Sequence, residues 1–195
     1  VVVLPDGQAW LEGMRVDPEH RRRGIAWHFS LYKLDFARRR GARVARLGTG
    51  DYNTAVHAMM ERAGMVRVGE YVHLTAAALP GDPPQVVAAE DAPRVRAFLK
   101  QSQALAASGG LYSTRWTWHE LSDRQAERFL QAGQIVGRFA PDGSLAALAI
   151  VEREQDGERV WVGFADVDPS VDVPAGIVVD LPEGEEARRR ALLAH

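Results

Sequence analysis

The chain has 195 residues, of which 46% are hydrophobic, and a formal net charge of −2. This composition predicts an ordinary globular protein and gives no basic field that favours nucleic acid. The absence of cysteine excludes disulfides, thiolate nucleophiles and thiolate metal ligands. No apolar run approaches the roughly 20 residues that a membrane-spanning helix needs, and no signal peptide is visible. We therefore expect a cytoplasmic protein of one large domain or of two small or incomplete ones.

The first elements are predicted to be a hairpin. Residues Val1–Leu4 are apolar and β-branched, and Pro5-Asp6-Gly7 is a turn signal. The second strand is predicted over Ala9–Val16, with Trp10, Glu12 and Met14 on alternate positions. Because the sequence begins without Met, in what reads as the middle of a strand, we expect the parent protein to be longer.

A basic turn follows this strand. Asp17-Pro18 should end the strand, since proline has no N–H for the next ladder bond and suits the first turn of a helix. The segment Arg21–Ala26 then combines three arginines with a glycine at the start of a predicted helix, Gly24–Arg40. Free N–H groups and the helix dipole make such a position suitable for an anion such as phosphate, although a solvated basic turn has the same pattern.

Further elements are predicted up to a proline-rich linker. A short strand is expected over Arg43–Leu47, a helix to Arg62 that Asp51 or Asn53 caps, and a strand over Met65–Leu74. Residues 75–84 contain three prolines and are predicted to be a linker.

The second half is predicted to contain both helices and strands. Helices are expected from Asp91 to about Gln103, from Ser122 to Gly133, and from about Glu183. Strands are expected over residues 85–89, 134–139, 145–153, 159–166 and 176–181, with hairpin turns at 141–143 and 156–157. The aromatic residues Tyr112, Trp116 and Trp118 alternate as in a strand, and they either pack into a core or line a substrate pocket.

The turn Arg21-x-x-Gly24-x-Ala26, preceded by LEGMRVDPEHR, resembles the acyl-CoA-binding motif of the GNAT superfamily of N-acetyltransferases, R/Q-x-x-G-x-G/A. The resemblance extends over residues 1–74, with Asn53 at the place of a recurring asparagine and Ala63-Gly64-Met65 like the usual "LGF". It implies a mixed α/β fold in which the turn holds the coenzyme A pyrophosphate and the preceding strand pairs with the pantetheine arm. The residues that it implies for coenzyme binding are Met14, Arg15, Val16, Arg21, Arg22, Arg23, Gly24, Ile25, Ala26 and Asn53.

The resemblance also suggests a catalytic arrangement. A backbone N–H of the Met14–Val16 segment would stabilise the oxyanion, and Glu12 is the candidate general base. Glu12 could instead bind a cationic substrate or pair with an arginine. Many members have a tyrosine acid where this chain has Met60, and a thioether cannot donate a proton. Tyr52 and Tyr71 are nearby in sequence and could replace it; otherwise the thiolate leaves unprotonated, or catalysis is lost.

A weak repeat indicates how the halves are related. The segments 6–18 and 156–169 both run from Asp-Gly through a tryptophan-containing strand to Val-Asp-Pro, but the second lacks the basic turn. We therefore expect the closing half of a GNAT domain over residues 1–74, a linker over 75–84, and a degenerate GNAT-like domain over 85–195. Alternatively, the two halves form one permuted domain.

The resulting prediction is an N-acetyltransferase that transfers an acetyl or other acyl group from acetyl-CoA to a primary amine of a small molecule or peptide. The alternatives are a coenzyme A-binding or scaffold module without catalysis and, against the negative net charge, an arginine-rich nucleic-acid binder. We expect no membrane partner, and a homodimer is possible. The six histidines show no metal-ligand spacing, so no metal is expected.

Overall fold

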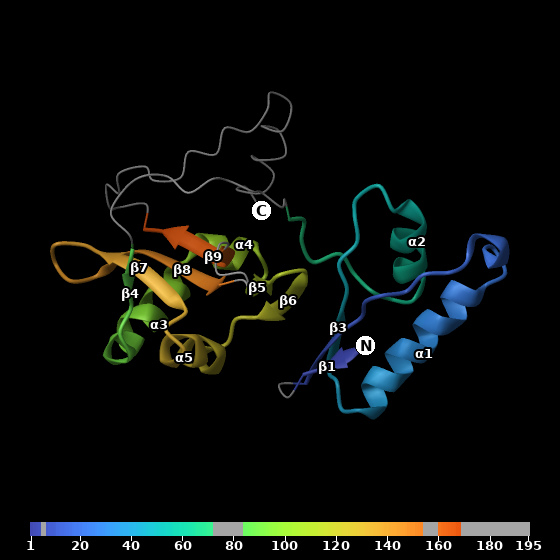
Figure 1. Cartoon of the computed structure of the whole chain (residues 1–195), viewed down its shortest axis with the longest axis horizontal. Helices are drawn as coiled ribbons and strands as arrows, with labels where there is room; N and C mark the ends of the chain where they lie inside the picture. The colour runs from blue at the N-terminus through green and yellow to red at the C-terminus, as the bar shows by residue number, and fades with distance from the viewer. Residues whose placement is uncertain (5–6, 72–83, 154–159, 169–195) are drawn as a thin grey trace, which may run out of the picture. The chain divides into compact units, whose positions relative to one another are not determined.

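The computed structural model describes residues 1–4, 7–71, 84–153 and 160–168. The chain divides into two compact units, which are treated separately (Figure 1). The N-terminal unit comprises Val1–Arg67 with Trp116–His119, and the C-terminal unit comprises Val68–Arg115 with Glu120–His195.

The N-terminal unit contains a βαβ arrangement. Strand β1 (Val2–Val3) pairs antiparallel with β2 (Gln8–Trp10), which confirms the predicted hairpin. Strand β2 pairs parallel with β3 (Val44–Arg46), and helix α1 (Ile25–Arg39) connects the two, as a parallel pair requires. All residues of the central strand β2 are buried. Helix α2 (Thr54–Arg62) follows β3 and agrees with the predicted helix.

The strand predicted over Ala9–Val16 is shorter than expected. Its ladder ends where Leu11 N donates to Arg46 O at 2.8 Å, because β3 pairs no further. Gly13 then has φ +68°, a left-handed conformation outside the β region. Residues 11–17 form an irregular segment, so the predicted alternation of Trp10, Glu12 and Met14 on one strand is wrong.

The strand predicted over Met65–Leu74 is not found in its described part. Residues 65–71 are irregular, and no described strand pairs with them. A strand also needs a neighbouring strand for its ladder, so apolar composition alone does not make one. Residues 72–74 and most of the predicted linker lie outside the described residues.

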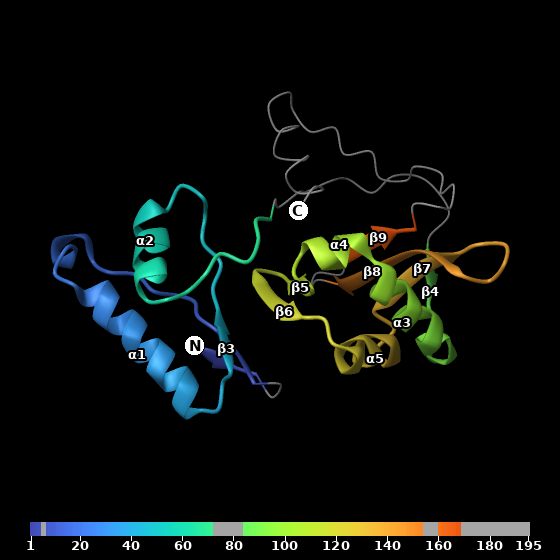
Figure 2. The same cartoon turned by 180° about the vertical axis from the view of Figure 1, so that it is seen from behind.

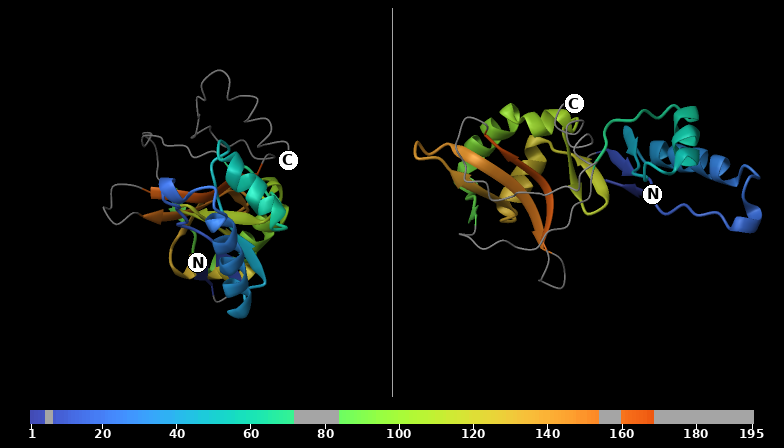
Figure 3. Two further views of the ribbon diagram at one scale, coloured as in Figure 1. Left: turned by 90° about the vertical axis from the view of Figure 1, so that its right-hand side faces the viewer. Right: turned by 90° about the horizontal axis from the view of Figure 1, so that it is seen from above.

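The C-terminal unit is an antiparallel sheet covered by helices on one face. The strand order is β4-β7-β8-β9, formed by Gln85–Val86, Ile135–Phe139, Leu145–Arg153 and Val160–Val167. Figure 2 shows α3 (Ala92–Gln101) and α4 (Gln103–Ala107) in front of this sheet, together with α5 (Asp123–Gln131). In the right panel of Figure 3 the long strands β8 and β9 lie side by side, in orange to red, with the helices on one side.

The core of this unit lies between that face and the helices. Val95 of α3 and Leu130 of α5 pack with Ile135, Leu148 and Phe164 of the sheet. Two 3-10 turns, η1 (Pro18–His20) in the N-terminal unit and η2 (Ala89–Asp91) here, precede α1 and α3. Ser122 caps α5 by accepting a bond from Gln125 N at 3.3 Å, which confirms the predicted helix start.

The predicted run of alternating aromatics is two short strands. Strands β5 (Leu111–Thr114) and β6 (Thr117–Glu120) form a hairpin, and Arg115 at its turn has φ +54°. Tyr112 is buried in the core, whereas Trp116 is exposed. The predicted turn at 156–157, strand at 176–181 and helix from Glu183 lie outside the described residues.

Candidate coenzyme-binding turn

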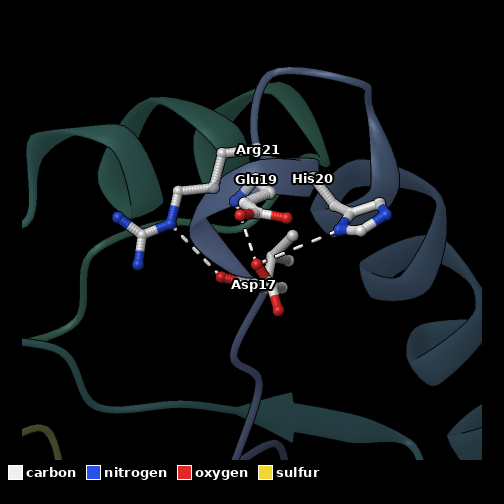
Figure 4. A network of polar contacts seen from close by, with 5 residues as sticks. Asp17, Glu19, His20 and Arg21 are labelled. Atoms are coloured by element: carbon white, nitrogen blue, oxygen red, sulfur yellow. Dashed lines mark hydrogen bonds and ion pairs between the residues drawn. The ribbon is translucent and has the colours of Figure 1, made fainter.

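The loop between the irregular segment and α1 is folded by Asp17. Its carboxylate Oδ1 accepts a bond from Glu19 N at 2.9 Å and lies 3.9 Å from His20 Nδ1 (Figure 4). Arg21 turns back, and its Nε donates to Val16 O at 3.2 Å. All these contacts lie within residues 16–21. They fold the loop that connects the irregular segment to the basic turn.

The basic turn has a backbone that depends on glycine. Gly24 is the N-cap of α1 with φ +77°, and Arg22 also has a positive φ of 60°. The first bond of the helix runs from His28 N to Gly24 O at 3.0 Å. The N–H groups of Ile25, Ala26 and Trp27 therefore have no partner within the helix, and a glycine cap brings no side chain to them.

This turn is open to a ligand. Arg21, Arg22, Arg23 and Gly24 are exposed, as is Ile25, while Ala26 is half-buried. Guanidinium groups beside free N–H groups at a helix N-terminus attract an anion from two directions. Of the sequence-predicted coenzyme residues, these six lie together in one continuous turn.

The remaining predicted residues have different surroundings. Met14 and Val16 are half-buried in the irregular segment, whereas Arg15 is exposed. Met14 is joined to α1 and Val16 to Arg21, so both are fixed to the elements that carry the turn. Asn53 is the N-cap residue of α2, but its Nδ2 donates to Thr49 Oγ1 at 3.1 Å and makes no cap bond.

Glu12 has its side chain in solvent and its backbone held by the helix. The carbonyl oxygen of Glu12 accepts a bond from Lys33 Nζ at 2.7 Å, and Lys33 is only 8% exposed. One turn earlier on α1, the buried Ser30 Oγ lies 3.7 Å from Met14 Sδ and 3.9 Å from Met59 Sδ. Helix α1 thus determines the path of the segment that contains Glu12 and Met14.

Sequence reasoning missed Lys33 and Ser30. Both lie on the same face of α1 because they are three residues apart. The sequence feature that could have identified them is a pair of polar residues within a predicted helix whose other residues are largely apolar.

Met60 and the two tyrosines that could replace the family's acid have different surroundings. Met60 is buried, consistent with a packing role for its thioether. Tyr52 is 86% exposed, and Tyr71 Oη donates to Ser108 O at 3.1 Å within the C-terminal unit.

Two further properties concern ligands and membranes. Within the described ranges, no three histidine or acidic side chains are placed to hold a metal ion. None of the helices in the described part of the chain has the length and apolar character that crossing a bilayer requires.

A strand, a basic turn with a left-handed glycine and a helix N-terminus define an α/β unit of the kind that receives an anionic ligand. Residues 1–65 match the model of the acetyltransferase (GNAT) family. The match lies over the N-terminal part of the chain and agrees with the family resemblance that its motif predicted. No curated protein and no solved structure matches the chain.

Proposed function

We propose that this chain binds acetyl-CoA through its N-terminal unit and transfers the acetyl group to a primary amine. The observation that carries the proposal is the exposed turn Arg21–Ala26, with left-handed Gly24 at the start of α1, inside the segment that matches the family. The coenzyme A pyrophosphate would bind the free N–H groups of the first turn of α1 and the adjacent guanidinium groups.

The irregular segment would receive the rest of the coenzyme. Its residues Met14, Arg15 and Val16 follow the end of β2, where the pairing with β3 stops at Arg46. Backbone groups that leave a sheet ladder need other partners, and the pantetheine amides can supply them. One N–H of this segment would also bind the oxyanion of the tetrahedral intermediate.

Glu12 would act as the general base, directly or through a water molecule. The ammonium group gives one proton to the carboxylate, and the freed nitrogen attacks the thioester carbon to form the tetrahedral intermediate. Collapse of this intermediate breaks the carbon–sulfur bond and releases the thiolate, while the nitrogen loses its second proton to solvent and becomes the amide nitrogen. Supporting this role, the Glu12 side chain is exposed next to a backbone that Lys33 fixes. Met60 cannot protonate the departing thiolate, which would take its proton from water or another acid.

The alternative function is coenzyme A binding without catalysis. The observation that favours it is the buried thioether of Met60 at the position where the family resemblance calls for a tyrosine acid. Both functions require the same turn, so they are separated by turnover and not by binding.

For the C-terminal unit we propose a degenerate GNAT-like domain over residues 85–195, joined by a linker over 75–84. Its support is the order of the described elements, a strand, two helices and, after the hairpin and α5, three antiparallel strands. That order resembles the opening half of a GNAT domain. The alternative remains one permuted domain made from both halves.

The test of coenzyme binding is a calorimetric titration of the whole chain with acetyl-CoA, compared with Gly24→Ala and Gly41→Ala. Both glycines have positive φ, +77° and +84°, and they lie at opposite ends of α1. Each substitution forces a left-handed alanine, costing about 1–2 kcal/mol. We expect the parent and Gly41→Ala to bind alike and Gly24→Ala to lose about tenfold or more in affinity. No binding by the parent chain, or equal binding by the variants, would overturn the proposal.

A further inference from the structure

The C-terminal unit contains a cavity that the proposed coenzyme site does not use. Its volume is ≈ 200 Å³, and it lies between β5, the end of α5, the residue that precedes β7, and the strands β8 and β9. Six of its lining residues carry the argument: Tyr112, Ser113, Phe129, Gln134, Glu152 and Trp161. Aromatic rings and polar groups line this space together, as in small-molecule sites.

Glu152 continues the inward face of β8 beyond its buried residues. On the inward face of β8, Leu148 and Ile150 are 2% and 4% exposed, and Glu152 is the next residue on the same face. Its side chain is 34% exposed, so Glu152 lies between the buried part of this face and solvent. A carboxylate that follows two buried apolar residues on one face departs from their apolar pattern, and such departures are typical of functional sites.

Trp161 is the cross-strand partner of Glu152. The register of β8 and β9 passes from Ile150 opposite Phe164 to Val151 opposite Val162, which leaves Gly163 as an extra residue. This bulge keeps both Phe164 and Trp161 on the inward face of β9. Trp161 and Glu152 are therefore cross-strand neighbours on the inward face, and both line the cavity.

Strand β5 fixes the indole in that place. A Cβ atom on Gly163 would lie 2.0 Å from Ser113 O, so only glycine allows the backbone of β5 to cross here. Ser113 Oγ then accepts a bond from Trp161 Nε1 at 3.3 Å. The wall of the cavity formed by Trp161 is thus tied to the strand that closes it.

The charged partner of Glu152 in the described structure leaves room for a ligand. Arg115 NH2 lies 3.8 Å from Glu152 Oε1, beyond hydrogen-bond distance, and its side chain is 52% exposed. An ion pair of this kind contributes little, about 0–1 kcal/mol. A cation that donates a hydrogen bond to the carboxylate inside the cavity would therefore compete well with Arg115.

We propose that this cavity binds a small organic cation. Its ammonium group would donate to the Glu152 carboxylate, and its apolar body would pack against Trp161 and Phe129. Aromatic walls favour such a ligand, because they accept both an apolar group and a cation over the ring. The site belongs to the C-terminal unit and does not depend on coenzyme binding by the N-terminal unit.

The first test compares two probes of equal shape on the whole chain, benzylammonium and neutral benzyl alcohol. Binding is followed by the NMR shift of the Trp161 indole N–H, which is assigned by its absence in Trp161→Phe. We expect a saturable shift with benzylammonium. For the alcohol we expect an affinity at least about tenfold weaker. Equal affinities would mean a merely apolar cavity, and no saturable shift of Trp161 would mean no site; either result overturns the proposal.

The second test uses three charge variants with the same probe. Glu152→Gln should lose about tenfold or more in benzylammonium affinity, since the ionic partner becomes neutral. Glu127→Gln is the matched control, because Glu127 also pairs with one arginine, Arg96, at 2.9 Å but lies outside the lining. Arg115→Gln should strengthen binding, since it removes the competing cation. Weaker benzylammonium binding by Arg115→Gln would mean that Arg115 does not compete for the carboxylate, and unchanged binding in Glu152→Gln would mean that the carboxylate is not the partner; either result overturns the proposal.

Discussion

Lys33 Nζ donates a 2.7 Å hydrogen bond to the backbone carbonyl of Glu12, joining α1 to the irregular segment after β2. The lysine is only 8% exposed, and its ammonium nitrogen also lies 5.3 Å from the centre of the Phe29 ring. Charge-assisted bonds in a buried place are stronger than neutral ones. The segment that carries the candidate base is therefore held by a helix side chain where the sheet ladder has ended.

Replacing Lys33 by methionine should release this segment. The substitution keeps the length of the side chain but leaves the Glu12 carbonyl without its donor, so we expect a loss of about 1–3 kcal/mol in the free energy of unfolding. Urea denaturation followed by tryptophan fluorescence measures the loss, and faster amide exchange at Gly13 would locate it. Lys100→Met is the matched control, because Lys100 is the other lysine of the chain and is exposed on α3.

The Lys33 variant also tests whether the hydrogen bond to the Glu12 carbonyl contributes to stability. Equal stability of Lys33→Met and Lys100→Met, with unchanged exchange at Gly13, would contradict the view that α1 fixes the segment.

Replacing Glu12 by glutamine should separate catalysis from coenzyme binding. If the carboxylate is the general base, kcat falls about 10²–10⁴-fold while the dissociation constant for acetyl-CoA stays the same. Thiol release from acetyl-CoA with a panel of amines measures turnover, and calorimetry measures binding. The control is Glu19→Gln, an exposed carboxylate on the neighbouring turn η1.

Two other results with Glu12→Gln would be informative. A raised KM for the amine with unchanged kcat would assign Glu12 to binding of a cationic substrate. No turnover in the parent chain, combined with normal acetyl-CoA binding, would favour the non-catalytic alternative.

The sequence predicted the local elements well where local rules decide them. The turn from Arg21 to Gly24 and the cap at Ser122 depend on nearby residues, and both helices begin as expected. The strand expected up to Val16 was wrong because its length depends on β3, a partner that is distant in sequence. Lys33 was missed for the same reason, since its role requires the position of the Glu12 carbonyl.

The cavity of the C-terminal unit could not be predicted from the sequence. A glutamate at position 152 reads as the polar end of a strand, and only the register with β9 places it opposite Trp161 on the inward face. The crossing of Ser113 at Gly163 is equally nonlocal. Alternation patterns identify which residues share a face, but they do not identify which face another element covers.

The turn between β7 and β8 should show a measurable pH effect. Hydrogen bonds from Ser144 Oγ at 2.6 Å and from Ser144 N at 2.9 Å lower the pKa of Asp142. Since the folded pKa lies below the unfolded one, the turn is stabilised by this carboxylate above the unfolded pKa, and the contribution is lost as the pH falls through the folded pKa.

Ser144→Ala should therefore raise the pKa of Asp142 toward the ordinary value of about 3.9. The substitution removes the hydrogen bond from the serine hydroxyl, which lowers this pKa more than the bond from the backbone N–H does. An NMR titration of the Asp142 carboxyl carbon measures it. Ser122→Ala, which removes a hydroxyl from a different cap, should leave this titration unchanged. An unaltered Asp142 pKa in Ser144→Ala would show that the serine hydroxyl is not its main partner.

The inward face of β8 should dominate the stability of the C-terminal unit. Leu148 is 2% exposed within the cluster that includes Val95 and Ile135, so Leu148→Ala leaves a cavity and should cost about 2–5 kcal/mol. Val162→Ala is the control on the outer face of β9, where the side chain is 52% exposed and the loss should stay below about 1 kcal/mol. Thermal unfolding of the two variants measures the difference. Equal losses would mean that both faces of this sheet are covered to the same extent, which would contradict a core confined to the helical face.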